Sequence, residues 1–262
     1  MSYLRNSCYL PYCIEVEEVH SNRYGKRGYK RAPRKEPTRE EIAEANERRR
    51  IKKLYRIIAT NFDFGDYHTV LTYRKDERPT PEQAKKILRT LLRNLRKAYQ
   101  KRGEPLHYII VTEYERAAIH HHLIINEIGD TIKILKKLWP YGGTHVTPIY
   151  EAEEVKELAA YLIKETQKSF RKKDNPNKLA YSCSRNMKKA VVKTKVIKAN
   201  NWKKEAVPPA GYMFRRGDNV TRINVLGYPY RYYTMVRITA GKGEGWIKPR
   251  KYAPESRGVP PD

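Results

Sequence analysis

The residues best suited to chemistry lie in the short apolar stretch Ile119–Asn126 (IHHHLIIN), which is typical of a buried β-strand. Side chains alternate between the two faces of a strand, so His120 and His122 point to one face and His121 points to the other. Two imidazoles on one face of a rigid strand make half of a site for a divalent transition metal. We therefore predict that His120 and His122 are metal ligands; the alternative is a half-exposed strand with solvated histidines.

A carboxylate on the preceding strand completes this predicted metal site. Residues 107–113 also read as a strand, and residues 114–118 can turn the chain back to form a hairpin. If Glu113 lies opposite His120, it shares the histidine face, and three protein ligands leave coordination positions open. Glu115 is the competing third ligand.

A tyrosine with nucleophilic potential lies on the helix predicted at residues 151–170. Tyr161 lies away from the apolar stripe of that helix, together with Glu157, Lys164 and Lys168. A phenol can attack a phosphodiester and form a covalent intermediate. Lys164 is placed to hold the phosphate or the phenolate, and Glu157 is a candidate general base for a second step. A surface tyrosine among surface charges gives the same pattern.

The charge of the whole chain points to a polyanionic partner. Its 262 residues carry a formal net charge of +26, which suggests nucleic acid, with an anionic membrane surface as the alternative. No run approaches the length of a transmembrane helix, and the N-terminus lacks the apolar core of a signal peptide. An odd number of cysteines without a secretory signal suggests reduced thiols in a cytosol. The 21 tyrosines, interleaved with Lys and Arg, suit stacking on unpaired bases.

Helix caps and hydrophobic periodicity predict the elements that position these residues. Thr80, Pro81 and Gln83 open the clearest helix, and Gly103 ends it. From residue 68 to residue 170 the predicted order is β-α-β-β-α-β-α. This order predicts an α+β fold of the ferredoxin-like, split βαβ kind, with an antiparallel sheet and helices on one face, plus terminal extensions.

We expect three segments along the chain. Residues 1–56 form a basic N-terminal arm and a helix that begins near Thr38, residues 57–200 form the catalytic domain, and residues 201–262 form a β-rich C-terminal extension. Residues 1–36 show no clear period, so we expect a flexible or loosely docked arm. The C-terminal extension contains aromatic residues that either stack on bases or pack: Trp202, Tyr228, Tyr230, Tyr232 and Tyr233.

Three motifs, in this order along the chain, resemble those of the HUH endonucleases. Val70-Leu71-Thr72-Tyr73 resembles the first motif strand of rolling-circle replication initiators. His120-His121-His122 resembles the His-hydrophobic-His motif, with histidine in the middle position. Tyr161-Leu162-Ile163-Lys164 resembles the Tyr-x-x-Lys nucleophile motif. Each motif is weak alone, whereas the ordered set over residues 68–170 is fairly specific.

The resemblance implies a chemistry as well as a fold. Members of this superfamily nick single-stranded DNA with Mn²⁺ or Mg²⁺, leave a 3′-hydroxyl and keep a 5′-phosphotyrosine link. Carried over to this chain, it implies that Tyr161 is the nucleophile, Lys164 its helper, and His120, His122 and Glu113 the metal ligands. Families with two tyrosines place the second where this chain has Glu157. A glutamate there, as in some plasmid initiators, implies that water ends the cycle by hydrolysis.

We therefore expect an enzyme that nicks and joins a single-stranded or hairpin DNA origin and initiates rolling-circle replication. The sequence contains no P-loop, so we expect a host or separately encoded helicase as a partner, and no membrane partner. The expected setting is the cytoplasm of a prokaryotic cell, with a plasmid or phage as the source. Further residues expected to contact DNA are Thr72, Arg74, Lys168, Arg171, Lys172 and Arg185.

Other functions remain open at this point. A conjugative relaxase or a single-strand transposase performs the same chemistry in another context. A non-enzymatic RNA- or single-stranded-DNA-binding protein fits the same core topology, since RNA-recognition modules share it. A purely structural metal site would leave Tyr161 and Lys164 unexplained.

Overall fold

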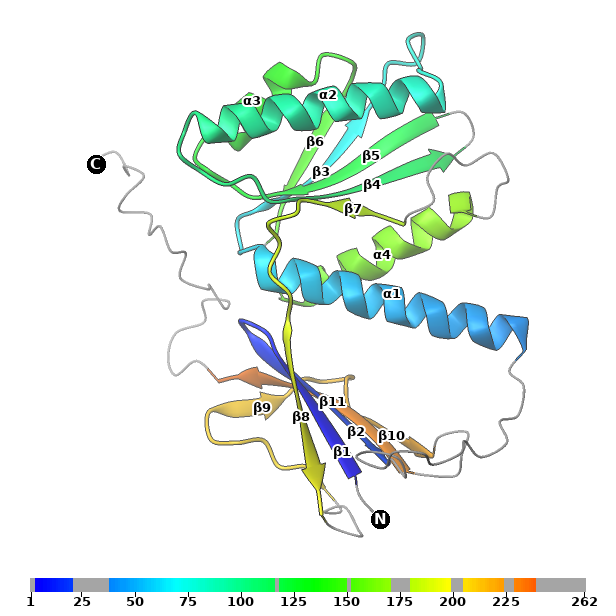
Figure 1. The fold of residues 1–262 in the computed structure, drawn as a ribbon, viewed down its shortest axis with the longest axis vertical. Coiled ribbons are helices and arrows are strands. Elements are labelled where there is room, and N and C mark those ends of the chain that lie inside the picture. The colour runs from blue at the N-terminus through cyan, green and yellow to red at the C-terminus, as the bar shows by residue number, and fades with distance from the viewer. Residues whose placement is uncertain are drawn as a thin grey trace. The chain divides into compact units, whose positions relative to one another are not determined.

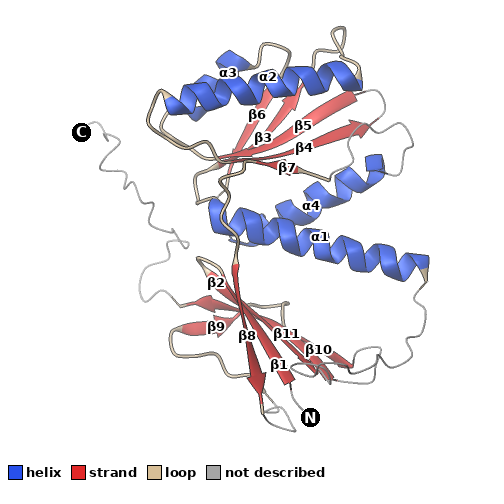
Figure 2. Ribbon diagram, in the orientation of Figure 1, coloured by secondary structure: helices blue, strands red, loops and turns tan. Residues whose placement is uncertain are grey.

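The described residues of this computed structural model are 3–20, 38–115, 118–149, 152–170, 180–198, 205–223 and 229–238. They form four α-helices and two antiparallel β-sheets, which confirms the predicted α+β class (Figure 2). The chain divides into two compact units. The first comprises Met1–Glu44 and Lys189–Trp246, and the described part of the second lies within Ala45–Lys188. The boundary between the units falls inside the first helix, α1 (Arg39–Asn61).

The second unit contains the predicted βαββαβ core. Its elements in chain order are β3 (Tyr67–Thr72), α2 (Pro81–Gln100), β4 (Tyr108–Glu115), β5 (Ala118–Ile125), α3 (Thr131–Leu138), β6 (Thr144–Pro148), α4 (Ala152–Phe170) and β7 (Ser182–Cys183). The strands pair antiparallel in the order β6-β3-β5-β4-β7. The sequence from β3 to β6 is the split βαβ, ferredoxin-like arrangement that the sequence predicts.

Helices lie on both faces of this sheet. α2 and α3 cover one face, and α4 lies against the other, where it contacts β4 (Figure 1). The core under α2 is fully closed: Leu95 and Tyr99 of α2 pack with Leu123 and Ile125 of β5, all 0% exposed. The predicted placement of helices on one face therefore holds for the two core helices. The added helix α4 covers the face that carries His120 and His122.

The helices begin where their capping residues predict. Thr80 and Gln83 exchange side-chain and backbone hydrogen bonds at the start of α2, and Thr38 and Glu41 do the same at the start of α1. Each box satisfies backbone N–H groups that have no partner within the helix. Within the described segments, no helix combines the length and the apolar character needed to cross a membrane.

The first unit is a sheet built from both ends of the chain. Its strands are β1 (Tyr3–Tyr9), β2 (Cys13–His20), β8 (Val191–Ile197), β9 (Tyr212–Phe214), β10 (Val220–Ile223) and β11 (Pro229–Arg237). They pair in the order β10-β11-β2-β1-β8, and β9 pairs with β11. The β-rich character expected after residue 201 is present. The three predicted segments nevertheless differ from these two units, because the terminal strands share one sheet.

The prediction of a loose N-terminal arm is wrong for residues 3–20, which form β1 and β2. The reason lies in two buried glutamates of β2. Glu15 and Glu18 are 3% and 2% exposed, on opposite faces of the strand, so β2 lacks the polar–apolar alternation that marks a strand. Glu15 accepts a hydrogen bond from the hydroxyl of Tyr232 at 2.6 Å, and Glu18 is ion-paired. The basic run Arg23–Arg31 lies outside the described residues.

Candidate active site

The β4–β5 hairpin has the register that the sequence predicts. Glu113 lies opposite His120, and Val111 lies opposite His122. Directly paired residues share a face of an antiparallel sheet, and residues two apart on a strand share it as well. His120, His122 and Glu113 therefore lie on one face, the face that α4 covers.

His121 faces the opposite side, as predicted, and belongs to the core. Its ring nitrogens lie 2.9 Å from the hydroxyl of Tyr73 and 2.9 Å from the hydroxyl of Thr112. Its ring also contacts Trp139 edge to face. Burial, with smaller contributions from the charges of His122 and His120, lowers the pKa of His121 to about 3. The imidazole is thus neutral, and both nitrogens have hydroxyl partners.

His122 is held from two sides. Its Nε2 lies 3.4 Å from Oε2 of Glu113, and its Nδ1 lies 3.2 Å from Nε2 of His68 on β3. The rings of His68 and His122 stack with their centroids 5.5 Å apart. Burial, followed by the charges of His68 and His120, lowers the pKa of His122 to about 4, against an opposing effect of Glu165. At neutral pH His122 is therefore in the neutral form that binds metals.

His68 and Glu165 are site residues that the sequence reasoning missed. Burial lowers the pKa of His68 to about 4, so this ring is neutral as well. Glu165 is a buried carboxylate of α4, 9% exposed, whose charge acts on His122. The available signal for His68 was its position four residues before Thr72 on one strand, which puts both on the site face. Glu165 follows Lys164 in the nucleophile motif, and nothing in its spacing marks it.

The donor set on this face suits a divalent metal in its chemistry. His122 and Glu113 approach within 3.4 Å, both are buried, and His120 lies beside Glu113 in register. Two imidazoles and a carboxylate are ligands accepted by several divalent transition metals. In the described part of the chain, no three His, Cys, Asp or Glu side chains are already arranged around one metal position. The side chain of Glu115, the competing ligand, lies outside the described residues.

Tyr161 stands next to this histidine face. The ring centroids of Tyr161 and His122 are 5.5 Å apart, and the rings meet edge to face at 80°. Tyr161 is 44% exposed, so its phenol contacts the site while remaining accessible from solvent. Glu157 and Lys164 are exposed on the same helix, as the helical spacing predicts, whereas Leu162 is fully buried. The combination of a neutral histidine pair, a carboxylate and an accessible phenol suits phosphodiester chemistry.

Thr72 lies in this face, paired with His120, but its polar groups are used by the turn after α3. The hydroxyl of Thr72 accepts a hydrogen bond from the backbone N–H of Gly143 at 3.1 Å, and its carbonyl accepts one from the Trp139 indole at 3.0 Å. A Cβ on Gly142 would lie 2.3 Å from the same carbonyl oxygen. Thr72 therefore anchors the end of β3 beside His120.

The other residues expected to contact DNA are dispersed. Arg74 follows β3 and forms an exposed ion pair with Glu77 at 3.0 Å. Arg185 is exposed and lines a different hollow, together with Arg96 of α2. The side chain of Lys168 and the residues Arg171 and Lys172 lie outside the described residues.

Comparison with known proteins agrees with this geometry. Residues 66–170 match the model of a family described as replication-associated protein, of the ORF2 type. The match runs from the start of β3 to the end of α4, so it spans both histidines and Tyr161. No curated protein and no solved structure matches the chain.

Proposed function

Given that residues 66–170 match the replication-associated protein family, we propose that this chain initiates replication by nicking DNA. The family supports the resemblance to rolling-circle initiators and a role at an origin. The nicking chemistry is our proposal, and the proximity of Tyr161 to His122 is the observation that carries it. The proposed substrate is a single-stranded or hairpin origin, and the proposed compartment is a prokaryotic cytoplasm.

In the proposed reaction, Tyr161 attacks a backbone phosphorus of the DNA strand. A bond forms between the phenolic oxygen and phosphorus while the bond from phosphorus to the 3′-oxygen breaks. The phenol loses its proton, and the departing 3′-oxygen gains one to become a 3′-hydroxyl. Lys164, one turn from Tyr161 on the exposed side of α4, stabilises the phenolate or the phosphate by its charge.

His120, His122 and Glu113 are the proposed holders of Mn²⁺ or Mg²⁺. A bound divalent cation would polarise the scissile phosphate and offset its developing charge. His68 keeps the ring of His122 in a fixed orientation by stacking on it and contacting its Nδ1, the role that outer partners of ligating histidines commonly have.

A covalent-adduct assay tests the proposed nucleophile. Incubation with a labelled single-stranded origin oligonucleotide and Mn²⁺ should give a protein–DNA adduct that survives denaturation. Tyr161→Phe should form no adduct, since it lacks the attacking oxygen, and the double variant His120→Ala, His122→Ala should lose it too. Tyr232→Phe is the matched control in the other unit and should retain the adduct. An adduct that persists in Tyr161→Phe would contradict the assignment.

Glu157 has a proposed role in ending the reaction. It is exposed one turn before Tyr161, where a carboxylate can act as general base for water or for a 3′-hydroxyl. Glu157→Gln should leave the first nick nearly unchanged and let the adduct accumulate, which a time course of adduct formation and release measures. If the first nick disappears in this variant, Glu157 acts in the first step instead.

A further inference from the structure

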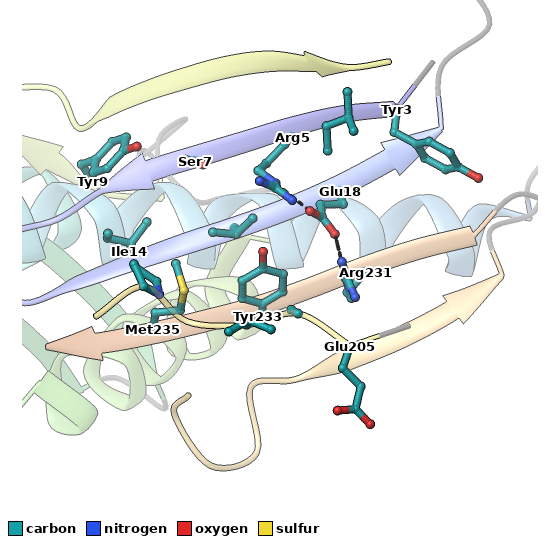
Figure 3. Close-up of a pocket in the computed structure, with 15 residues that line it drawn as sticks. Tyr3, Arg5, Ser7, Tyr9, Ile14, Glu18, Glu205, Arg231, Tyr233 and Met235 are labelled. Carbon is teal, nitrogen blue, oxygen red and sulfur yellow. Dashed lines mark hydrogen bonds and ion pairs between the residues drawn. The ribbon is translucent and has the colours of Figure 1, made fainter. Parts of the chain in front are cut away.

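The sheet of the first unit contains a pocket outside the candidate active site. Its volume is about 550 Å³, within the range of small-ligand sites. Strands β1, β2 and β11 form its floor, and the segment around Glu205–Pro209 borders it. Figure 3 shows Arg5, Glu18 and Arg231 together within this pocket, with Tyr9 toward one end.

The centre of the pocket is a cationic cluster. Oε1 of Glu18 lies 2.7 Å from Nε of Arg5, and Oε2 lies 2.7 Å from Nε of Arg231. Glu18 and Arg231 are buried, whereas the side chain of Arg5 is 43% exposed. Two guanidinium groups share one carboxylate, so the cluster carries a net positive charge on its accessible side, at Arg5. Charge-assisted contacts of a guanidinium to phosphate are among the strongest available to a protein.

The same sheet face adds further cations and an exposed aromatic ring. Lys193 and Lys195 of β8 lie opposite Ser7 and Arg5, and both lysines are exposed. Tyr9 is 47% exposed, and the ammonium of Lys193 lies 5.5 Å from its ring centroid. Glu205, exposed at the rim, is the carboxylate that offsets part of this charge. An exposed aromatic ring between cations on a sheet is the usual platform for an unpaired base.

We propose that this pocket binds a short segment of single-stranded DNA, with a phosphate at Arg5 and a base stacked on Tyr9. The inference rests on the proposed function for the identity of the ligand, but not for the geometry of the site. It gives the first unit a role in holding the strand that the second unit cleaves. Tyr233 belongs to the pocket floor, while Tyr230 and Tyr232 donate hydrogen bonds to Glu17 and Glu15 on the opposite face of the sheet.

Binding measurements on the full chain test this site. The probe is a short fluorescein-labelled single-stranded oligonucleotide of mixed sequence, followed by anisotropy at several salt concentrations. Arg5→Gln should reduce the slope of log Kd against log salt by about 0.7, the value for one lost phosphate contact on a single strand. Arg5→Lys should restore the slope. Tyr9→Leu should weaken binding by about fivefold or more at constant slope, since stacking carries no charge.

Arg222→Gln is the matched control, because Arg222 is exposed on β10, opposite Tyr230, on the other sheet face. Arg5→Gln leaves Glu18 paired with Arg231, so the fold should persist, and a thermal melt checks this. Equal slope changes in Arg5→Gln and Arg222→Gln would overturn the site. Equal losses on a duplex of the same sequence would overturn the preference for single strands. Competition by a free deoxynucleoside monophosphate as effective as that by the strand would assign the pocket to nucleotides instead.

The adduct assay separates this inference from the proposed function. If Tyr161 forms no adduct but the Arg5 and Tyr9 variants behave as expected, the nicking proposal fails and the pocket stands. If the adduct forms and both variants bind as the unaltered chain does, the pocket inference fails alone.

Discussion

Three consecutive histidines have two different roles because a strand alternates its side chains. His121 lies in the core between Tyr73 and Thr112, and His122 lies on the other face between His68 and Glu113. Both rings are neutral because burial disfavours their charged form. The difference is therefore one of partners: hydroxyl groups fix His121, while a carboxylate and a second imidazole surround His122.

The core histidine makes folding sensitive to acid. The pKa of His121 is about 3 in the folded chain and about 6.5 in an unfolded one, so below pH 6.5 the unfolded state binds one more proton. Stability at neutral pH is unaffected, and it falls by about 1.4 kcal/mol per pH unit for this group as the pH drops below 6.5. His121→Gln should remove this contribution.

Urea titrations with a chelator present, between about pH 6 and pH 4, measure the effect as a slope. The slope is independent of any constant loss of stability in His121→Gln. His68 and His122 contribute slopes of their own, so the variant should lose one proton's share and no more. Identical slopes in the two proteins would show that His121 becomes protonated in the folded state.

Local signals determine how much of the fold the sequence predicts. The caps at Thr38 and Thr80 predicted two helices, and the short turn after Glu115 fixed the hairpin register that brings Glu113 beside His120. β1 and β2 were missed because Glu18 is buried by two arginines distant in sequence, a pairing that no local pattern reveals. His68 was missed for a similar reason, since its partner His122 lies on another strand.

The turn between α3 and β6 should be as important for the site as the strands are. Gly142→Ala places a Cβ against the backbone carbonyl of Thr72, which cannot move without shifting the end of β3 beside His120. We expect a loss of about 1–3 kcal/mol in unfolding free energy, as for other overpacked positions, and slower nicking. Denaturant titration and the adduct assay measure the two effects.

Gly103→Ala is the control for this substitution. Gly103 has φ +71°, so alanine strains the backbone there, but nothing lies within 4 Å of the added Cβ. It should lower stability and leave the nicking rate of the folded protein unchanged. Equal nicking rates for Gly142→Ala and Gly103→Ala, both fully folded, would separate the turn from the site.

Across the whole molecule, charge and chemistry are distributed differently. The family match and the candidate active site both fall within the second unit, whereas the cationic pocket lies in the first. The excess of cations, +26 overall, acts on any polyanion regardless of sequence. Affinity for DNA and the chemical step should therefore respond to different changes.

DNA binding should weaken steeply with salt. Each neutralised phosphate of a single strand contributes about 0.7 to the slope of log Kd against log salt, so several contacts give a slope well above one. Tyr161→Phe should keep both the affinity and the slope, because it removes a hydroxyl and no charge. Anisotropy with a labelled single strand measures both quantities. A shallow slope in the unaltered protein would contradict a binding mode dominated by phosphate contacts.

The sheet shared by β2 and β11 has a consequence for synthesis on the ribosome. Its partners Glu15 and Tyr232 are 217 positions apart, so β2 emerges long before β11 exists. Strands β3 to β7 all lie between Tyr67 and Cys183 and can pair earlier. Glu18 must therefore wait for Arg231 as an unburied carboxylate, and the acidic residues of β2 keep this early strand hydrated. The first part of the protein to be made is thus the last to close.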